Sequence, residues 1–227
     1  MSGLYPGLRP RAVLTLLGLL ATLSGCTSPA ARLEQLARQQ NHRLATLSTT
    51  QFDLRVSLPN APQPDSRLRV YLEGDGRAWI TATQPSLDPT PRDLLLARLA
   101  LSDPRPSVYL ARPCQFVQSP GCTPQYWTHA RFAQEIVDSL SEALDQLQRQ
   151  HGNRDFELIG YSGGGALALL LAAARDDIAQ VQTLAGVDHH HAGWLERWRH
   201  WRDRPIECRT TRGQASGRFE TQRADSP

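Results

Sequence analysis

A serine flanked by glycines is the residue of this chain best suited to covalent chemistry. Ser162 lies in the sequence Gly160-Tyr161-Ser162-Gly163-Gly164, with a glycine two positions before it and another two positions after it. A serine hydroxyl that attacks a carbonyl forms an acyl intermediate, which divides one difficult hydrolysis into two easier steps. Glycines at the flanking positions allow a turn so sharp that a side chain there would collide with neighbouring backbone. The spacing therefore predicts a nucleophile elbow, a turn that presents a serine at the end of a strand.

The residues on either side of this turn have the composition of a strand and of a buried helix. The apolar residues Phe156, Leu158 and Ile159 precede it, and a run rich in alanine and leucine extends to Ala174. A helix that begins directly after Ser162 points its unpaired amides at the turn, where they can stabilise an anion. The alternative interpretation is a glycine-rich strand-to-helix turn that carries no chemistry.

A second glycine-containing loop, upstream of the serine, is a candidate oxyanion site. Gly74-Asp75-Gly76 follows an apolar segment, and its glycines allow backbone amides to turn towards a ligand. Acyl transfer needs such amides to hold the negative oxygen of its tetrahedral intermediate. We expect the amide of Asp75, with Gly76 as its neighbour, to act together with the amide of Gly163. The alternatives are a tight polar turn, or a carboxylate pair of Glu73 and Asp75 that serves metal or glycoside chemistry.

A nucleophilic serine also needs a histidine to accept its proton and a carboxylate to orient that histidine. The first downstream candidates are Asp188, which follows the next apolar run, and His189. A histidine adjacent to the acid in the chain cannot easily fold back onto it. The run His189–His191 therefore also fits a solvated loop or incidental metal binding, and His200 and His129 are remoter candidates. We expect no dedicated metal site and no cofactor.

The first 25 residues predict a lipoprotein signal peptide. A short basic region precedes the apolar stretch Ala12–Leu23, which is too short to cross a bilayer of about 30 Å as a helix. The closing Leu-Ser-Gly-Cys sequence resembles a bacterial lipobox, so we expect Cys26 to be lipidated as the first residue of the mature chain. Thr27 favours the outer membrane over the inner one, and we expect the protein at its periplasmic face. The alternatives are an ordinary cleaved signal and an uncleaved anchor.

Two further cysteines lie in one loop. Cys114 and Cys122 are eight residues apart in a segment rich in Pro, Gly, Ser and Gln. In an oxidising compartment this arrangement favours a disulfide. A metal site is less favoured, because no further cysteine or histidine lies at ligand spacing nearby. The fourth cysteine, Cys208, is left without a partner.

The charge balance gives no reason to expect a nucleic acid partner. The chain of 227 residues has 25 basic residues, all of them arginine, against 22 acidic ones, which gives a formal net charge of +3. The two arginines of the signal peptide account for most of this excess. A nucleic-acid-binding chain would carry a basic patch or stripe.

Alternating strand and helix patterns predict an α/β fold: a mostly parallel sheet with helices on both faces. The predicted strands cover 52–58, 68–72, 107–111, 156–161 and 181–187, and the predicted helices cover 92–101, 131–150 and the elbow helix to 174. We divide the chain into the signal peptide (1–25), a tether with an amphipathic helix (26–50), the α/β domain (51–190) and an atypical tail (191–227). The tail is predicted to be disordered, because apolar residues are sparse in it.

With these motifs in hand, the chain resembles bacterial lipoproteins of the α/β-hydrolase fold in the serine hydrolase superfamily. The resemblance covers about residues 68–186 and rests on the GYSGGG elbow, the EGDG loop, and the DPTPRD and ARPCQF…YW segments between them. It implies that Ser162 is the nucleophile and that the amides of Gly163 and Asp75 hold the oxyanion. It also implies a small-molecule or lipid ester as substrate and a membrane contact through Cys26.

The end of the sequence departs from this pattern. In the α/β-hydrolase fold the acid and the base follow later strands, but only 40 residues follow Val187 and none of their runs resembles a strand. We therefore expect the fold to be incomplete after the strand that follows the elbow helix, through truncation or a frameshift. The alternative to an active esterase is a catalytically inactive envelope lipoprotein or a remnant of a hydrolase.

Overall fold

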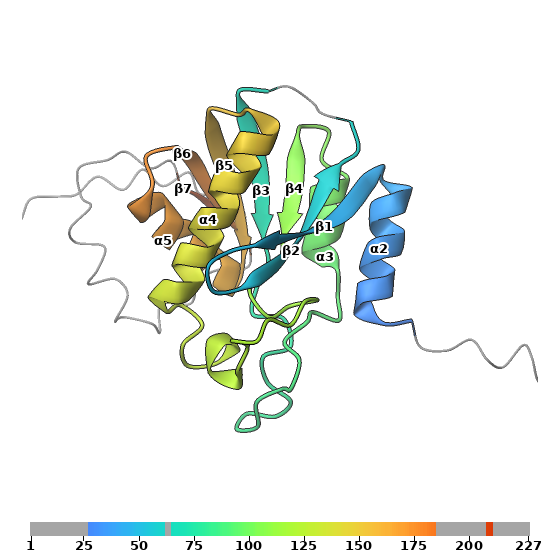
Figure 1. Ribbon diagram of the computed structural model, residues 1–227, viewed down its shortest axis with the longest axis vertical. Coiled ribbons are helices and arrows are strands. Elements are labelled where there is room, and N and C mark those ends of the chain that lie inside the picture. The colour runs from blue at the N-terminus through green and yellow to red at the C-terminus, as the bar shows by residue number, and fades with distance from the viewer. Residues whose placement is uncertain (1–26, 62–64, 185–207, 211–227) are drawn as a thin grey trace, which may run out of the picture.

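The computed structural model describes residues 27–61, 65–184 and 208–210, and its centre is a seven-stranded sheet in the order β1-β2-β4-β3-β5-β6-β7 (Figure 1). The strands are β1 (His42–Ser48), β2 (Asp53–Pro59), β3 (Arg67–Leu72), β4 (Ser107–Leu110), β5 (Asp155–Tyr161), β6 (Ile178–Leu184) and β7 (Cys208–Thr210). β2 pairs antiparallel with both β1 and β4, and all other pairs are parallel. The mostly parallel sheet is the predicted one.

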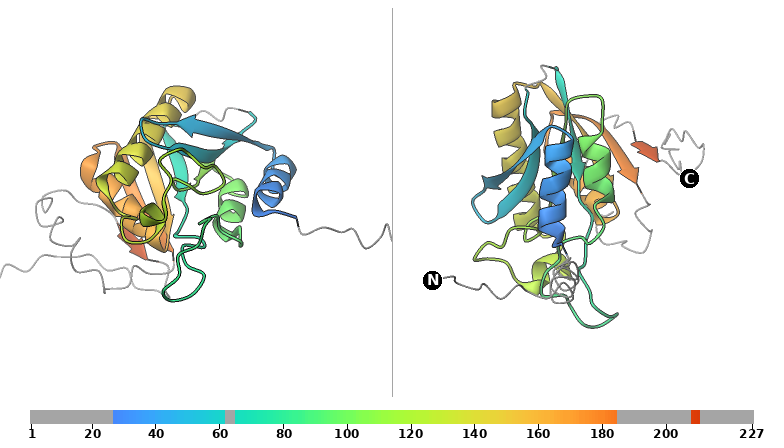
Figure 2. Two further views of the ribbon diagram at one scale, coloured as in Figure 1. Left: turned by 60° about the horizontal axis from the view of Figure 1, so that its bottom comes forward. Right: turned by 90° about the vertical axis from the view of Figure 1, so that its right-hand side faces the viewer.

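Helices cover both faces of this sheet, as the sequence predicts (Figure 2). They are α2 (Pro29–Gln39), α3 (Leu95–Leu101), the short 3-10 helix η1 (Pro124–Trp127), α4 (Gln134–His151) and α5 (Gly163–Ala174). Residues of α4 and α5 pack into the larger apolar core on one face, and residues of α2 and α3 pack into a smaller core on the other. Among the described helices, none is long and apolar enough to cross a membrane.

The two helices beside the elbow differ in how they are buried, as their sequences require. In α4 the buried residues Ile136, Leu140, Leu144 and Leu147 recur every three or four positions, so that one stripe faces the sheet. In α5 eight of the twelve residues are buried, because this helix is apolar on all sides. An all-round buried helix holds its N-terminus, and with it Ser162, in a fixed place.

The predicted tether is wrong in its second half. The amphipathic helix predicted within 26–50 ends at Gln39, and residues 42–48 form β1, which pairs with β2 over seven residue pairs. The chain leaves the helix at Asn41, whose positive φ of 56° is tolerated by asparagine. Leu44 and Leu47 suit helical spacing as well as a strand, so only the partner strand decides between them. The domain therefore begins before the predicted boundary at residue 51.

The end of the sheet also differs from the prediction. β6 begins three residues before the predicted strand, and Leu184 is the last described residue of this strand. Within the tail predicted to be disordered, Cys208–Thr210 forms β7, which runs parallel to β6. Three residues are too few for a periodic signal, so no strand is predicted there. The rest of 191–227 lies outside the described residues, and the predicted truncation stays a prediction.

Candidate active site

Ser162 occupies a strained turn between a strand and a helix. β5 ends at Tyr161 and α5 begins at Gly163, so Ser162 alone makes the turn. Its backbone has φ 49° and ψ −120°, a conformation that residues other than glycine rarely adopt. Such strain costs about 1–3 kcal/mol and persists only where the surrounding structure imposes it, most often at functional sites. Here the Ser162 amide donates to the carbonyl of Leu184 over 2.9 Å, which ties the turn to β6.

The glycines around the serine are required by close backbone contacts. A Cβ on Gly160 would lie 2.5 Å from the Cα of Gly165, and a Cβ on Gly164 would lie 2.5 Å from the carbonyl oxygen of Glu73. Backbone atoms cannot yield as a flexible side chain would, so the collisions expected from the sequence are confirmed. The contact at Gly164 also packs the start of α5 directly onto the end of β3.

The loop after β3 lies against the serine. A Cβ on Gly74 would be 3.4 Å from the Cβ of Ser162 and 2.9 Å from the carbonyl oxygen of Tyr161. The amide of Gly74 itself donates to the Glu73 carboxylate over 2.8 Å, so it is already engaged. Among the amides of this loop, those of Asp75 and Gly76 therefore remain as candidates for an oxyanion, and their assignment stays a prediction.

The side chain of Asp75 has a role that sequence reasoning missed. Its carboxylate lies against Gly163, where an added Cβ would be 2.8 Å from the carboxylate carbon. A negative charge at this position interacts favourably with the N-terminus of α5. Asp75 forms ion pairs with Arg112 and, over 3.5 Å, with Arg131. These two guanidiniums offset a fixed negative charge that would otherwise oppose an oxyanion developing nearby.

Glu73, the other carboxylate of the loop, is buried and fully engaged. Its oxygens accept hydrogen bonds from the Tyr109 hydroxyl and the Gly74 amide, each over 2.8 Å. Burial raises the pKa of Glu73 above its usual value, although these bonds and the charge of Arg112 act in the opposite direction. Burial and the Glu73 charge also raise the pKa of Tyr109. Because Glu73 and Asp75 have separate partners, this geometry does not favour a paired carboxylate site.

The proposed acid and base are not placed. Asp188 and the run His189–His191 lie outside the described residues, as does Cys26. The described histidines all have other surroundings: His42 begins β1, His151 ends α4, and the ring of His129 packs edge to face with Trp79 at 5.7 Å. The assignment of Asp188 and His189 therefore stays a prediction.

The predicted disulfide is present. Cys114 and Cys122 are joined, with their Cα atoms 5.6 Å apart, and the bond closes the loop that follows β4. In the part of the chain that the structure describes, no group of three or more His, Cys, Asp or Glu residues could hold a metal ion.

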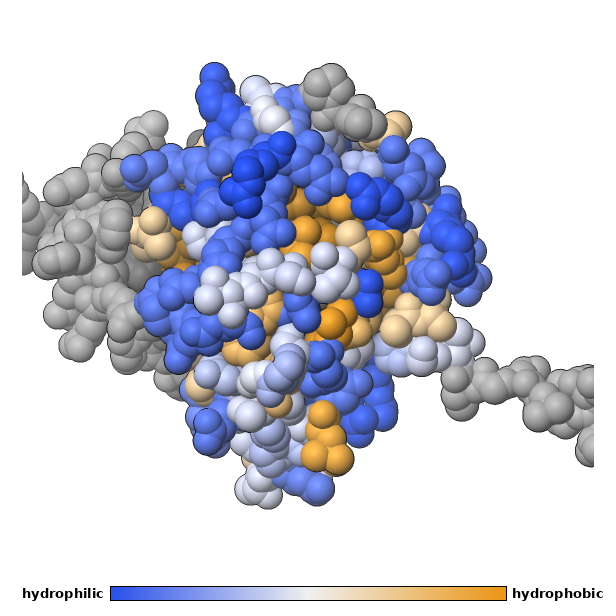
Figure 3. Space-filling view, viewed as in Figure 1, coloured by the Kyte–Doolittle hydropathy of each residue, from blue (hydrophilic) through white to orange (hydrophobic). Residues whose placement is uncertain are grey.

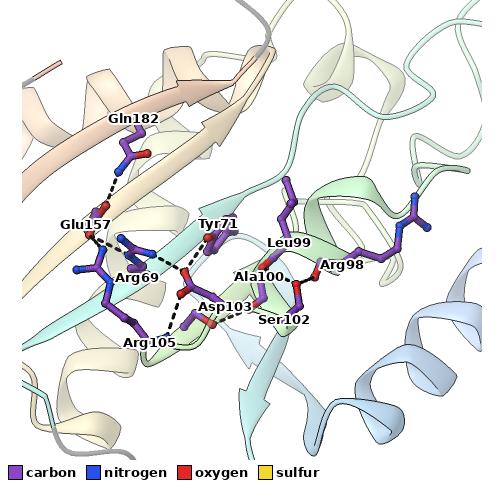
Figure 4. A network of polar contacts seen from close by, with 11 residues as sticks. Arg69, Tyr71, Arg98, Leu99, Ala100, Ser102, Asp103, Arg105, Glu157 and Gln182 are labelled. Atoms are coloured by element: carbon purple, nitrogen blue, oxygen red, sulfur yellow. Dashed lines mark hydrogen bonds and ion pairs between the residues drawn. The ribbon is translucent and has the colours of Figure 1, made fainter. Parts of the chain in front are cut away.

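A separate network of buried charges lies away from the elbow (Figure 4). The buried Glu157 accepts hydrogen bonds from Arg69 over 3.0 Å and from Arg105 over 2.7 Å, and Asp103 accepts from Arg69 and Tyr71. Burial, assisted by Asp103, raises the pKa of Tyr71. Glu157 is five residues before Ser162, about 16 Å along an extended strand. The network therefore holds β3 and β5 side by side but takes no part in chemistry at Ser162.

No family model and no curated protein matches this chain. Among solved structures it is similar to a hormone-sensitive lipase from a metagenome library (19% identity, 79% of this chain and 57% of that one, TM-score 0.37). It is also similar to a membrane phospholipase A described as a bacterial virulence factor (18% identity, 78% and 52%, TM-score 0.42). A third is the esterase Est22 (14% identity, 78% and 52%, TM-score 0.44). The chain spans little more than half the length of these proteins.

Proposed function

We propose that this chain has an α/β-hydrolase fold and is a serine hydrolase that cleaves carboxylic esters through an acyl-enzyme. The observation that carries the proposal is the backbone of Ser162, strained at φ 49° between β5 and α5. A fold that needed only a turn here would not require this conformation from a residue other than glycine.

In the proposed reaction the Ser162 hydroxyl attacks the ester carbonyl and gives up its proton to a histidine. The amides of Gly163 and Asp75 stabilise the negative oxygen of the tetrahedral intermediate. When that intermediate collapses, the alcohol leaves with the proton from the histidine, and Ser162 keeps the acyl group. Water then repeats the sequence and releases the carboxylic acid. Asp188 and His189 are the proposed acid and base.

The proposed substrate is a small-molecule or lipid ester, and the proposed location is the periplasmic face of the outer membrane through a lipid on Cys26. The long loop between β3 and α3 supports a lipid, since Leu87 is 87% exposed and Ile80 is 46% exposed. In Figure 3 a small apolar area lies near the lower end of the molecule, to which this loop extends in Figure 1, and larger apolar areas lie in the middle of the same face. Exposed apolar side chains on a loop that follows the strand next to β5 suit a hydrophobic partner.

A fluorophosphonate probe, which reacts with activated serines, tests the proposal. We expect the wild-type protein to be labelled and to hydrolyse p-nitrophenyl esters, and Ser162→Ala to lose both properties. Ser102→Ala, which removes an exposed hydroxyl at the end of α3, is the matched control and should leave both unchanged. A wild-type protein that is neither labelled nor active would contradict the proposal and favour a lipoprotein without turnover.

A further inference from the structure

We propose that Gln115 and Arg112 are positioning residues, which hold the loop 74–76 so that the amide of Asp75 points at the oxyanion. Both residues lie in the turn after β4, next to the disulfide. The inference rests on the proposed function, because it assigns these side chains to the oxyanion site of that reaction.

Gln115 contacts the loop on both sides of Asp75. Its side chain is buried, with 2% of the residue exposed. Nε2 donates to the carbonyl oxygen of Gly74 over 2.9 Å, and Oε1 accepts from the amide of Arg112 over 3.2 Å. A Cβ on Gly76 would lie 2.8 Å from the same Nε2. One amide side chain therefore binds the carbonyl of Gly74 and lies against Gly76, and the same Nε2 also donates to the carbonyl of Pro89 over 3.5 Å.

The bond to Gly74 determines where the amide of Asp75 points. The carbonyl of Gly74 and the N–H of Asp75 belong to one planar peptide unit, and the described chain has no cis peptide. In a trans unit the C=O and N–H point in opposite directions. By holding the carbonyl oxygen on one side, Gln115 keeps the N–H directed to the other side. Without that bond, the peptide is free to rotate and the donor is no longer preorganised.

Arg112 holds the side chain of Asp75 in place. It is 3% exposed and pairs with the Asp75 carboxylate through Nη1, while Nη2 donates to the carbonyl oxygen of Arg131 over 2.6 Å. The planar guanidinium can make both contacts at once, which a lysine ammonium could not reproduce in the same geometry. The backbone and the side chain of the loop are thus held by two residues of one turn.

The backbone of this turn is itself strained. Cys114 and Phe116, on either side of Gln115, have φ values of 69° and 62°, which residues other than glycine rarely adopt. The disulfide holds Cys114, and the amide of Phe116 donates to the hydroxyl of Thr90 over 2.8 Å. Strain of this kind persists where the surroundings impose it. Its result here is to aim the side chain of Gln115 inwards.

The chain provides a matched control in Gln118. Its Nε2 also donates to a backbone carbonyl over 2.9 Å, that of Cys114, in the same loop, but it does not contact residues 74–76. Gln115→Glu and Gln118→Glu each replace one donating amide by an isosteric carboxylate. In Gln115→Glu the new oxygen faces the carbonyl of Gly74, while the acceptor for Arg112 is retained.

The test measures ester hydrolysis, thermal unfolding and amide hydrogen exchange over 74–77 for both variants. Losing one oxyanion donor costs about 100- to 1,000-fold in kcat. We expect Gln115→Glu to lose at least about tenfold of kcat, with KM within about twofold, and to exchange faster over 74–77. Gln118→Glu should resemble the wild type. If Gln115→Glu does not fold, Gln115→Met replaces it.

Two kinds of failure are distinguishable. If the wild type is labelled by the fluorophosphonate but Gln115→Glu keeps wild-type kcat and exchange, the positioning role is wrong and the proposed function stands. The positioning role is also wrong if Gln115→Glu changes only its unfolding temperature. If the wild type is neither labelled nor active, the proposed function fails, and the positioning role of Gln115 and Arg112 fails with it.

Discussion

At the scale of single residues, the site depends on places where no side chain fits. Gly164 is the clearest case, because a Cβ there would press on the backbone of Glu73 in a neighbouring strand end. We predict that Gly164→Ala lowers the free energy of unfolding by about 1–3 kcal/mol, the usual cost of overpacking. Urea denaturation measures it. Gly121→Ala is the control, since its Cβ would lie at ordinary van der Waals distances, 3.6 Å from Phe52 and 3.7 Å from the carbonyl oxygen of Gln51, and equal stability of the two variants would contradict the prediction.

Glu73 gives a prediction about pH. Its pKa is raised above the usual 4.5 in the folded protein, so the folded state binds more protons than the unfolded state above that pH. Stability therefore falls as the pH rises from about 4.5 through the folded pKa. In Glu73→Gln this loss disappears, and its stability relative to the wild type should increase with pH over that window. Urea midpoints between pH 4 and 8 measure the difference, and a constant difference would show that Glu73 does not titrate in this way.

At the scale of elements, local sequence patterns predict individual helices and strands well, but they do not predict which strands pair. The strand, elbow and buried helix around Ser162 are one continuous segment, so their periodicity and glycines could be read from the sequence. The edge strand His42–Ser48 could not, because its leucines suit a helix until β2 is beside it. The segment ARPCQF, which holds Arg112 and Gln115, contributes to the resemblance, but the sequence does not show what either side chain does, since their partners Asp75 and Gly74 are distant in sequence and come close only in the folded sheet.

The disulfide loop gives a prediction at this scale. Because Cys114 adjoins Gln115, opening the loop should disturb the oxyanion site as well as the fold. We expect the double substitution of Cys114 and Cys122 by serine to lower the free energy of unfolding by roughly 2–4 kcal/mol. We also expect kcat to fall while the protein is still folded. Activity and circular dichroism, measured together at low temperature, separate these effects, and a folded double variant with full kcat would contradict the second expectation.

At the scale of the whole molecule, the sheet order brings the site together. β4, β3 and β5 are neighbours and run parallel, so the segments that follow them meet at one edge. These segments carry Arg112 and Gln115, Asp75, and Ser162. The sequence predicts each strand but not their order, because order depends on which strands meet in the folded chain. The composition of the site could therefore be predicted only in part.

The position of α2 connects this edge with the proposed lipid anchor. α2 begins at Pro29, capped by the hydroxyl of Ser28, three residues after Cys26. The start of α2 lies at the same end of the molecule as the loop between β3 and α3 (Figure 2). That loop also carries the exposed Leu87. A lipid on Cys26 would therefore bring the Ser162 end of the molecule close to the membrane, as hydrolysis of a lipid ester requires.

This arrangement predicts that the anchor matters more for some substrates than for others. In the full chain produced in a Gram-negative host, the wild type should fractionate with the outer membrane and Cys26→Ser should be released. Cys208→Ser is the control, since it removes a cysteine outside the signal segment. For a short soluble ester, kcat/KM should be the same in all three proteins. For an ester embedded in vesicles, Cys26→Ser should lose activity, because the variant has no lipid to hold it at the vesicle surface. Equal vesicle hydrolysis by Cys26→Ser and the wild type would show that the anchor does not present the site to the membrane.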